Sequence, residues 1–468
     1  MAEPLYMTAI EALAALHGAG LGDARLEGAP GARFKAASSD SRAVAGESLF
    51  VAIAGERVDG HDYLAQALAS GATCLLVSEA AWPTREAALA KAIEAAGAAV
   101  LVVSSPLAAL QAIATERRRS VPQILRIGIT GSSGKTTTKE IAASILSVSR
   151  RVAMNPGNLN SDIGLSLSMF GMGADAEVGV FEMGMNRKGE MAELAGIYEP
   201  DIALVNNVGT AHIGILGSRD AIALEKKQIF SRFDGRQIGY VGEDEDYRAF
   251  LMEGVRGEMR DFGPRSLPGF RGAQDLGLDG YAVDWEGLKV RFPLVGRHNL
   301  ANALAAMALA ACVGTQAEDV AAGLEAVRPL FGRSEILKGR VTVIRDCYNA
   351  NPDSCEAAIE FCDALQWAGR RVYVIGSMLE LGSESEAAHR RVGRACAASG
   401  AGALFFFGEE ARPAFEEDRA SGFRGIMFFE TDFDRLSMAV RAGVGEGDLV
   451  LLKASRGMAL ERLSELLK

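Results

Sequence analysis

A short run of glycine, serine and threonine, placed between an apolar segment and an amphipathic one, most constrains how this chain folds. Residues 127–138 read Ile-Gly-Ile-Thr-Gly-Ser-Ser-Gly-Lys-Thr-Thr-Thr. Apolar residues within 124–129 predict a buried strand, and residues 139–146 predict a helix, so the run is a strand-to-helix turn. The backbone N–H groups of such a turn and the positive end of the helix dipole together bind phosphate oxygens.

Two side chains of this turn have the chemistry that a nucleoside triphosphate requires. Lys135 would reach the β- and γ-phosphates, and the hydroxyl of Thr136 would bind Mg²⁺. The usual pattern, G-x-x-x-x-G-K-[ST], has a glycine where this chain has Ile129. The alternative is a glycine-rich turn with an incidental lysine. Because a strand and a helix flank the turn, we predict that it binds a nucleoside triphosphate.

Length, composition and charge are those of a soluble globular protein with several domains. Hydrophobic residues make up 49% and charged residues 23% of the 468 positions, which allow two to four domains. The formal net charge of −11 argues against a general nucleic-acid binder. No apolar stretch reaches the roughly 18 residues that span a bilayer, and residues 1–20 predict a short amphipathic helix instead of a signal peptide. We therefore expect a cytoplasmic protein that neither binds nucleic acid nor inserts into membranes.

Cysteine usage and one basic run add two smaller expectations. Six cysteines show no C-x-x-C pairing and lie in apolar or helical settings, which predicts reduced thiols. The one dense basic run, residues 117–119, predicts the solvated end of a helix that covers residues 106–119.

Strands alternate with helices of 10–15 residues along most of the chain, which predicts an α/β protein with parallel sheets. We divide this alternation into three regions, 1–105, 106–330 and 331–468. Val121-Pro122 is a plausible joint before the strand that leads into the turn. Short glycine-rich segments between residues 239 and 294 indicate a β-rich insert. In the third region, strands are predicted at 340–345, 371–375, 403–407 and 448–453.

Three polar side chains follow the turn at positions where metal ligands could lie. Glu182 follows a predicted strand at 178–181, and ligands gather at the carboxyl ends of parallel strands, which favours a second Mg²⁺ contact. The alternative is an acidic cap at the start of a helix. His212 follows another predicted strand, but a lone histidine is more often a loop or core residue than a ligand. Lys226, taken alone, would belong to a solvated helix face.

Several motifs, in this order along the chain, resemble the Mur ligase family, the ATP-dependent amide-bond enzymes of peptidoglycan precursor synthesis. The resemblance covers about residues 36–462. The phosphate loop, residues 130–137, is similar to the variant loop of this family, which accounts for the missing first glycine. Segments 39–42, 46–52 and 59–62 resemble the part that binds the UDP-sugar. Segments 157–164, 182–190 and 296–303 resemble the substrate loop, the magnesium and substrate segment and the adenine-side helix start.

The third region resembles the MurF type within this family. Segments 346–354, 376–382 and 452–456 are similar to that type, and the D-N-P-R motif of the MurE type does not occur in the sequence. The resemblance implies a monomeric ligase that adds D-alanyl-D-alanine to UDP-N-acetylmuramoyl-tripeptide through an acyl phosphate, using ATP and two Mg²⁺ ions. It also implies a UDP-sugar-binding domain (1–105), a central P-loop ATPase domain (106–330) and a Rossmann-like ligase domain (331–468).

The resemblance further implies roles for individual residues. Lys226 would be carbamylated, which would allow it to hold the second Mg²⁺. The catalytic residues would be Lys135, Glu182, His212 and Lys226. The metal residues would be Thr136, Glu182, His212 and Lys226. The ATP contacts would be Thr130, Gly131, Ser132, Ser133, Gly134, Lys135, Thr136, Thr137, Asn299, Asn302, Arg333 and Asp346. The substrate contacts would be Ser41, Arg42, Asn158, Asn160, Arg187, Asn349 and Asn351.

Some positions depart from the family pattern, and other interpretations stay open. The departures are Asn155, Ser161, Gly214, Leu216, Gln228, Ser377 and Ala454. Because the phosphate and metal residues are intact, the departures bear on the peptide pocket more than on catalysis. The alternatives are a MurE-type ligase, a folylpolyglutamate-synthase-like enzyme and a non-catalytic nucleotide-dependent scaffold. Since the motifs are split between the second and third regions, we expect the third domain to close over the site.

Overall fold

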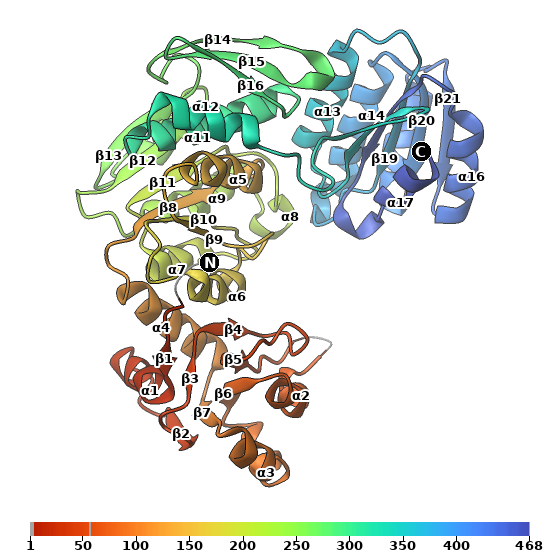
Figure 1. Ribbon diagram of the computed structural model, residues 1–468. Coiled ribbons are helices and arrows are strands. Elements are labelled where there is room, and N and C mark those ends of the chain that lie inside the picture. Colours follow the sequence, from red (N-terminus) through yellow and green to blue (C-terminus); the bar gives the residue numbers. More distant parts are fainter. Residues whose placement is uncertain (1–3, 56–57, 468) are drawn as a thin grey trace.

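Parallel strands form the centre of each of three α/β bodies, which follow one another along the chain (Figure 1). The computed structural model describes residues 4–55 and 58–467. The predicted α/β class with parallel sheets is confirmed, and the six cysteines are free thiols, as predicted. Within the described residues, no helix is both long and apolar enough to cross a membrane.

The N-terminal body is a five-stranded sheet in the order β2-β7-β6-β5-β4, in which only β2 runs antiparallel to its neighbour. Its strands are β2 (Arg25–Gly28), β4 (Ala36–Ser38), β5 (Ser48–Val51), β6 (Ala72–Ser78) and β7 (Ala99–Val103), and β1 (Met7–Thr8) pairs with β3 (Arg33–Phe34). Its helices are α1 (Ala9–Gly18), α2 (Leu64–Ala69) and α3 (Glu86–Ala96). The helix predicted over residues 1–20 begins only at Ala9, because Thr8 and Glu11 form a capping box there. Residues 1–3 of that prediction lie outside the described residues.

The central body contains a six-stranded sheet, wholly parallel, in the order β13-β12-β11-β8-β10-β9. Its strands are β8 (Leu125–Thr130), β9 (Val152–Met154), β10 (Val178–Glu182), β11 (Ile202–Val205), β12 (Ile238–Gly242) and β13 (Glu258–Phe262). Its helices are α5 (Lys135–Leu146), α6 (Asp162–Ser168), α7 (Glu190–Tyr198), α8 (Ile213–Leu216), α9 (Arg219–Lys227), α10 (Arg248–Met252), α11 (Arg297–Cys312) and α12 (Ala317–Ala326). The register pairs Glu182 with Ile129 and Val205 with Thr130. The loops that follow β8, β10 and β11 therefore start at the same edge of the sheet.

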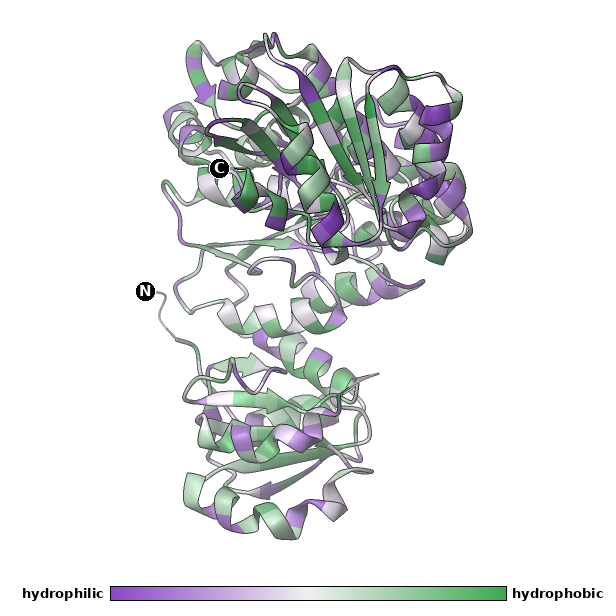
Figure 2. Cartoon of the chain, turned by 90° about the vertical axis from the view of Figure 1, so that its right-hand side faces the viewer, coloured by the Kyte–Doolittle hydropathy of each residue, from purple (hydrophilic) through white to green (hydrophobic). Residues whose placement is uncertain are grey.

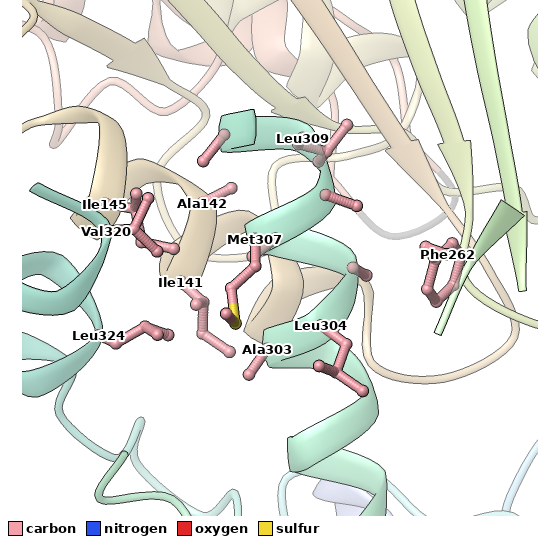
Figure 3. Packing of buried hydrophobic residues seen from close by; sticks show 14 of the residues in the cluster. Ile141, Ala142, Ile145, Phe262, Ala303, Leu304, Met307, Leu309, Val320 and Leu324 are labelled. Atoms are coloured by element: carbon pink, nitrogen blue, oxygen red, sulfur yellow. The ribbon is translucent and has the colours of Figure 1, made fainter. Parts of the chain in front are cut away.

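Three helices pack together on one face of this sheet and fix the phosphate loop. Ile141 of α5, Met307 of α11 and Leu324 of α12 belong to one buried apolar cluster (Figure 3). Helix α5 begins at Lys135, one turn earlier than predicted, although threonines at 136–138 are weak helix formers. All three threonines are buried, so tertiary packing overrides their local preference.

The region between residues 239 and 294 is only in part the β-rich insert that its glycines predicted. Strands β12 and β13 extend the central parallel sheet. Only β14 (Phe270–Asp275), β15 (Tyr281–Trp285) and β16 (Leu288–Phe292) form a separate antiparallel sheet, which lies near α11 and α12 in Figure 1. Trp285 and Phe292 of this sheet are buried in the same cluster as Met307.

The C-terminal body is a six-stranded sheet in the order β17-β18-β22-β19-β20-β21, with β17 antiparallel and the other strands parallel. Its strands are β17 (Glu335–Lys338), β18 (Thr342–Asp346), β19 (Arg371–Gly376), β20 (Ala401–Phe407), β21 (Ile426–Glu430) and β22 (Leu449–Lys453). Its helices are α13 (Pro352–Ala364), α14 (Ser385–Ala397), α15 (Arg412–Ala420), α16 (Phe433–Gly443) and α17 (Glu461–Leu466). Figure 2 shows the strands mostly in green and the outer helices banded with purple, as expected for helices that cover a buried sheet. Strands β17 and β21 were not predicted.

The prediction that residues 117–119 form a solvated helix end was wrong for Arg117 and Arg118, although Arg119 is exposed. Helix α4 (Pro106–Arg119) lies between the N-terminal and central bodies (Figure 1), and Arg117 and Arg118 are only 1% and 5% exposed. The Arg117 guanidinium donates hydrogen bonds to the carbonyl oxygens of Leu5 and Phe170. Backbone carbonyls thus offset the cost of burying this charge. The run joins the two bodies.

A buried carboxyl group in the C-terminal body makes stability depend on pH. Asp418 of α15 is 0% exposed, and neither carboxyl oxygen has a hydrogen-bond partner in the part of the chain that the structure describes. Burial, with a smaller effect of Glu417, raises its pKa from 3.8 to about 7. Between pH 4 and pH 7 the Asp418 carboxyl is protonated in the folded state but ionised in the unfolded state. The stability contributed by the protonated group is therefore present below pH 4 and is lost as pH rises through 7.

We therefore expect the Asp418→Asn variant to be more stable than the unmodified protein at pH 8, by up to about 4 kcal/mol, because one pKa unit corresponds to about 1.4 kcal/mol. At pH 4 the difference should largely disappear. Differential scanning calorimetry at both pH values measures it. Asp434→Asn, at an exposed position of α16, is the matched control and should change little. Equal gains at pH 4 and pH 8 would contradict the prediction.

Candidate active site

A cleft of about 420 Å³ opens where the carboxyl edge of the central sheet faces the C-terminal body. The loops after β8, β10 and β11 form one wall, and residues 346–354 form much of the other. Most of the predicted site residues line it. They are Ser132, Ser133, Gly134, Lys135, Thr136, Thr137, Asn158, Asn160, Glu182, His212, Asn299, Asn302, Arg333, Asp346, Asn349 and Asn351.

The phosphate loop has the backbone form that its glycines allow. Gly134 has φ +77° and leads directly into α5, and a Cβ at this position would lie 2.2 Å from Oδ1 of Asn302. Only glycine fits this conformation and spacing. Lys135 Nζ donates a hydrogen bond of 2.9 Å to the Gly131 carbonyl, and burial lowers the pKa of this lysine.

Two asparagines that follow β11 hold this loop in place. Oδ1 of Asn207 accepts hydrogen bonds from the backbone N–H groups of Ser132 (3.1 Å) and Ser133 (2.9 Å). Nδ2 of Asn206 donates to the Thr138 hydroxyl over 2.9 Å. Both asparagines line the cleft, and neither is among the predicted site residues.

The carboxylate of Glu182 lies against the start of α5. Its Oε2 accepts a hydrogen bond of 2.7 Å from the Thr136 hydroxyl, and its Oε1 accepts one of 2.5 Å from Nδ2 of Asn160. Arg333, in the segment that leads into β17, donates to the same hydroxyl over 3.1 Å. A carboxylate and a hydroxyl beside a phosphate-binding loop are hard oxygen donors of the kind that Mg²⁺ prefers.

This donor set fits Mg²⁺ that is shared with a nucleotide better than a metal held by protein alone. Among residues 4–55 and 58–467 there is no group of three or more histidine, cysteine, aspartate or glutamate side chains that could hold a metal ion. Mg²⁺ in phosphoryl-transfer sites needs only one or two carboxylates, because substrate phosphates and water supply the other ligands.

A buried asparagine sets the position of Glu182. Asn155 is 0% exposed; its Nδ2 donates to the carbonyls of Glu182 (2.9 Å) and Leu159 (2.8 Å), and its Oδ1 accepts from the Glu182 N–H (2.9 Å). Nζ of Lys139, itself buried, donates to the Asn155 carbonyl over 2.6 Å. Asn155, one of the departures from the family pattern, therefore ties the end of β10 to the loop that carries Asn160.

One buried and one half-buried basic side chain, Lys226 and His212, lie close to the phosphate loop. Lys226 is 1% exposed and does not line the cleft, and burial, with the nearby charge of Lys135, holds its pKa well below the ordinary value. Burial lowers the pKa of His212 to about 4, with smaller effects of Lys135 and Lys226, so its imidazole is uncharged at pH 7. Lys226 is thus not part of a solvated helix face, as it would be from its local sequence alone.

The C-terminal wall of the cleft is built around Asp346. Its Oδ2 accepts a hydrogen bond of 2.8 Å from Lys453 Nζ, which also donates to the Asn349 carbonyl over 2.9 Å. The N–H of Ser334 donates to its Oδ1 over 3.0 Å. Lys453 lines the cleft and was not among the predicted site residues, although it lies in the segment 452–456 that resembles the family.

Several predicted site residues lie outside the cleft. Ser41 and Arg42 belong to the N-terminal body, where Ser41 is buried and Arg42 pairs with a neighbouring carboxylate. Arg187 lies on the loop between β10 and α7 and pairs with two carboxylates there. Thr130 and Gly131 precede the part of the phosphate loop that lines the cleft. Substrate binding by Ser41, Arg42 and Arg187 stays a prediction.

Asparagine is concentrated at this site. The chain has ten asparagines, and nine of them line the cleft: Asn158, Asn160, Asn186, Asn206, Asn207, Asn299, Asn302, Asn349 and Asn351. The tenth, Asn155, is bonded to Glu182. A side-chain amide donates and accepts hydrogen bonds without adding charge, which suits a site that must order loops beside phosphates. This distribution is the sequence signal that could have identified Asn206 and Asn207.

Comparison with known proteins gives the class to which this fold and site belong. Three family models match the chain in order: "Mur ligase family, catalytic domain" over residues 33–118, "Mur ligase middle domain" over 129–310 and "Mur ligase, glutamate ligase domain" over 332–456. The chain belongs to the Mur ligase family, as its motifs predicted.

Relatives that match nearly the whole chain are of the MurF type. A Treponema pallidum (strain Nichols) protein named UDP-N-acetylmuramoyl-tripeptide–D-alanyl-D-alanine ligase is 44% identical over an alignment of 468 positions, which covers 98% of this chain and 98% of that protein. The crystal structure of MurF from Acinetobacter baumannii matches with a TM-score of 0.84 and 29% identity over 99% of each chain. The MurF ligase from Thermotoga maritima in complex with ADP matches with a TM-score of 0.76 and 26% identity, over 92% of this chain and 96% of that one. The predicted resemblance to the MurF type is confirmed.

Proposed function

We propose that this chain joins D-alanyl-D-alanine to UDP-N-acetylmuramoyl-tripeptide at the expense of ATP, as a step of peptidoglycan precursor synthesis. The observation that carries the proposal is the Thr136–Glu182 pair at the phosphate loop, which shares one cleft with the Asp346 wall of the C-terminal body. A ligase needs its phosphate and amine sites to face each other in this way. The name of the Treponema pallidum relative supports the same reaction.

The chemistry proceeds in two balanced steps. A carboxylate resists attack by an amine at neutral pH, so one oxygen of the terminal tripeptide carboxylate first attacks the γ-phosphorus of ATP. The bond from that phosphorus to ADP breaks, and an acyl phosphate forms. The amine of D-alanyl-D-alanine then attacks the acyl carbon and loses a proton. Inorganic phosphate leaves with the electron pair of the former carbon–oxygen bond, and the amide remains.

The residues of the phosphate loop would bind and orient the nucleotide. The N-terminus of α5 and the N–H groups of residues 131–134 would contact phosphate oxygens. Lys135 would exchange its present partner, the Gly131 carbonyl, for the β- and γ-phosphates. Arg333 would approach the same phosphates from the side of the C-terminal body, since it already reaches Thr136. Asn299 and Asn302 would lie on the adenine side and Asp346 near the ribose.

Mg²⁺, when bound, would offset charge on the transferred phosphoryl group. Thr136 and Glu182 would hold it, and His212 would lie beside them. The buried Nδ1 of His212 has no hydrogen-bond partner, which is expected of a side chain whose orientation is completed by a ligand or a moving element.

Lys226 would complete the site after carbamylation. Its unprotonated amine would add to carbon dioxide, forming a nitrogen–carbon bond and releasing a proton. The pKa of Lys226, held low by burial, favours the unprotonated amine that this reaction needs. The product is an oxygen ligand in place of a buried cation, and oxygen is what a second Mg²⁺ prefers.

Each predicted domain would bind one substrate. Residues 1–105 would bind the UDP-sugar through Ser41 and Arg42, and 106–330 would bind ATP. Residues 331–468 would bind D-alanyl-D-alanine through Asn349 and Asn351. The tripeptide would meet Asn158, Asn160 and Arg187. The first boundary precedes α4, which contributes to the apolar cores of both the N-terminal and the central body. The active form would be a monomer.

The test is phosphate release with the purified chain. We expect release from ATP and Mg²⁺ only when UDP-muramoyl tripeptide and D-alanyl-D-alanine are both present, with the lysine and diaminopimelate forms of the tripeptide assayed in parallel. Omission of either substrate should reduce release to background. Release with ATP alone would indicate a plain nucleotidase or a scaffold. Release that requires UDP-muramoyl dipeptide and a single amino acid would indicate the MurE type.

A further inference from the structure

Two segments from different bodies meet beside the cleft. In the central body the segment is 209–216, whose last four residues form α8, and in the C-terminal body it is 378–382. Thr210 donates to Oδ2 of Asp353 from its N–H (3.2 Å) and from its hydroxyl (3.1 Å). Further along, Gly214 lies so close to Gly382 that a Cβ on Gly214 would be 2.6 Å from the Gly382 nitrogen. The bodies are therefore in backbone contact here.

His212 and Glu380 face each other across this contact. Both have left-handed backbones, with φ of +64° and +66°, which non-glycine residues adopt at a cost and which recur at functional sites. Oε2 of Glu380 lies 3.9 Å from Nδ1 of His212. That nitrogen is buried and has no hydrogen-bond partner among residues 4–55 and 58–467, whereas the Glu380 side chain is 71% exposed. The exposed carboxylate of Glu380 thus lies slightly beyond hydrogen-bond distance of the buried Nδ1 of His212.

We propose that Glu380 is a positioning residue for His212, and that it links the approach of the C-terminal body to the order of the phosphate site. The inference rests on the proposed function, in which His212 lies beside Thr136 and Glu182. An imidazole with one proton can carry it on either nitrogen, and an acceptor at Nδ1 selects the Nδ1–H form. The lone pair of Nε2 then faces away from Glu380, and the ring is held in one orientation. An approach of about 1 Å would bring the pair to hydrogen-bond distance.

The connection to the phosphate loop is short. The loop that ends at His212 begins at Asn206 and Asn207, which bond the phosphate loop directly. In the C-terminal body, Asp353 accepts the hydrogen bonds of Thr210. Asp353 lies in the first turn of α13, two residues after Asn351 of the proposed dipeptide pocket. A small movement of the C-terminal body on binding its amine substrate would therefore reach His212 through a few covalently linked residues.

Kinetics of three variants test the role of Glu380. We expect Glu380→Ala to lower kcat about tenfold, as for outer partners of metal-site histidines, with the KM for ATP unchanged. Glu380→Gln keeps an acceptor oxygen and should retain most of the activity. Glu384→Ala, at an exposed glutamate four residues further along, is the matched control and should equal the unmodified protein. Because Glu380 is exposed, these variants should keep their unfolding temperature.

Nitrogen-15 NMR of the histidine-labelled full chain provides a readout that needs no turnover. With a non-hydrolysable ATP analogue and UDP-muramoyl tripeptide bound, His212 should show the Nδ1–H tautomer, assigned by comparison with His212→Gln. Glu380→Ala should lose this preference. Gly214→Ala, which keeps both side chains but whose Cβ would meet the backbone of Leu381 and Gly382, should lose it too. Gly171→Ala, where nothing lies within 4 Å of the added Cβ, is its control.

The outcomes separate this inference from the proposed function. An unchanged tautomer together with an unchanged kcat in Glu380→Ala would overturn the inference. A large loss of kcat in Glu384→Ala would overturn it too, because the effect would then not belong to Glu380. Absence of ligase turnover in the unmodified chain would count against the proposed function, while the tautomer measurement would still decide whether Glu380 orients His212.

Discussion

Replacing Lys226 with alanine should lower turnover by about a thousandfold or more. In the proposed mechanism the carbamylated side chain supplies an oxygen ligand for the second metal ion, and metal ions at phosphoryl groups contribute several kcal/mol of transition-state stabilisation. Each 1.4 kcal/mol, approximately, corresponds to a factor of ten in rate. Steady-state phosphate release with both substrates measures the loss. Formate or acetate should restore part of the rate, because a small carboxylate can enter the space that the side chain leaves.

Lys227 offers a matched control on the same helix. Its Nζ donates to the carbonyls of Phe250 and Glu253 near the surface, so Lys227→Ala should keep the turnover of the unmodified protein. The unmodified protein should also lose activity in buffers stripped of carbon dioxide and regain it with bicarbonate. If Lys226→Ala turned over at the unmodified rate, Lys226 would have no place in the site. Loss of turnover without rescue by any carboxylate would point to the amine itself.

The residues of the site that could be predicted from the sequence are those that follow neighbouring strands of the parallel sheet. Lys135 and Thr136 follow one strand and Glu182 ends the neighbouring one, so the edge rule for parallel sheets already places them together. The structure gives their contact as a hydrogen bond of 2.7 Å between the Thr136 hydroxyl and Glu182. Local patterns suffice here because the strand register, once parallel, leaves little freedom.

The sequence does not show which part of the protein packs against a given helix or strand. The arginines at 117–119 resemble a solvated helix end because the periodicity of a helix does not reveal the bodies on either side of it. The burial of Arg117 depends on carbonyls as distant as Leu5 and Phe170. Strands β12 and β13 were not predicted as part of the central sheet for a related reason. The glycines around them suggested a separate insert, and the sequence does not show which strand each of them pairs with. The same holds for Glu380 and His212, which belong to different bodies.

The distribution of asparagine is a less local signal in the sequence. All ten asparagines lie at the cleft or one hydrogen bond behind it, and they come from several of the segments that form it. Motif comparison identified most of them singly. Taken together they also indicate Asn206 and Asn207, which bond the phosphate loop. The positions of the asparagines along the chain therefore indicate the two site residues that the motifs did not.

Replacing Asn155 with leucine should lower kcat about a hundredfold. The amide group of Asn155 bonds both the N–H and the carbonyl of Glu182, and it also bonds the carbonyl of Leu159. Leucine would leave the buried N–H and carbonyl of Glu182 without these partners, at about 1–3 kcal/mol each, and would also free the partly buried Leu159 carbonyl. The end of β10 would shift to reach water or other donors, and a displacement of about 1 Å in a catalytic group can cost a hundredfold in rate.

Two further substitutions at the same position show which part of the amide matters. Asn155→Asp keeps the acceptor for the Glu182 N–H but sets a carboxylate oxygen against two carbonyls, so it should be as damaging as leucine. Asn155→Thr, the residue that the family pattern favours, keeps one hydroxyl donor and should retain more activity than either. Because the hydrogen bonds of the Asn155 amide go to Glu182 and Leu159 and not to the phosphate loop, ATP binding measured by calorimetry without magnesium should stay unchanged in all three. A leucine variant with unaltered kcat would show that the end of β10 holds Glu182 in place without this amide.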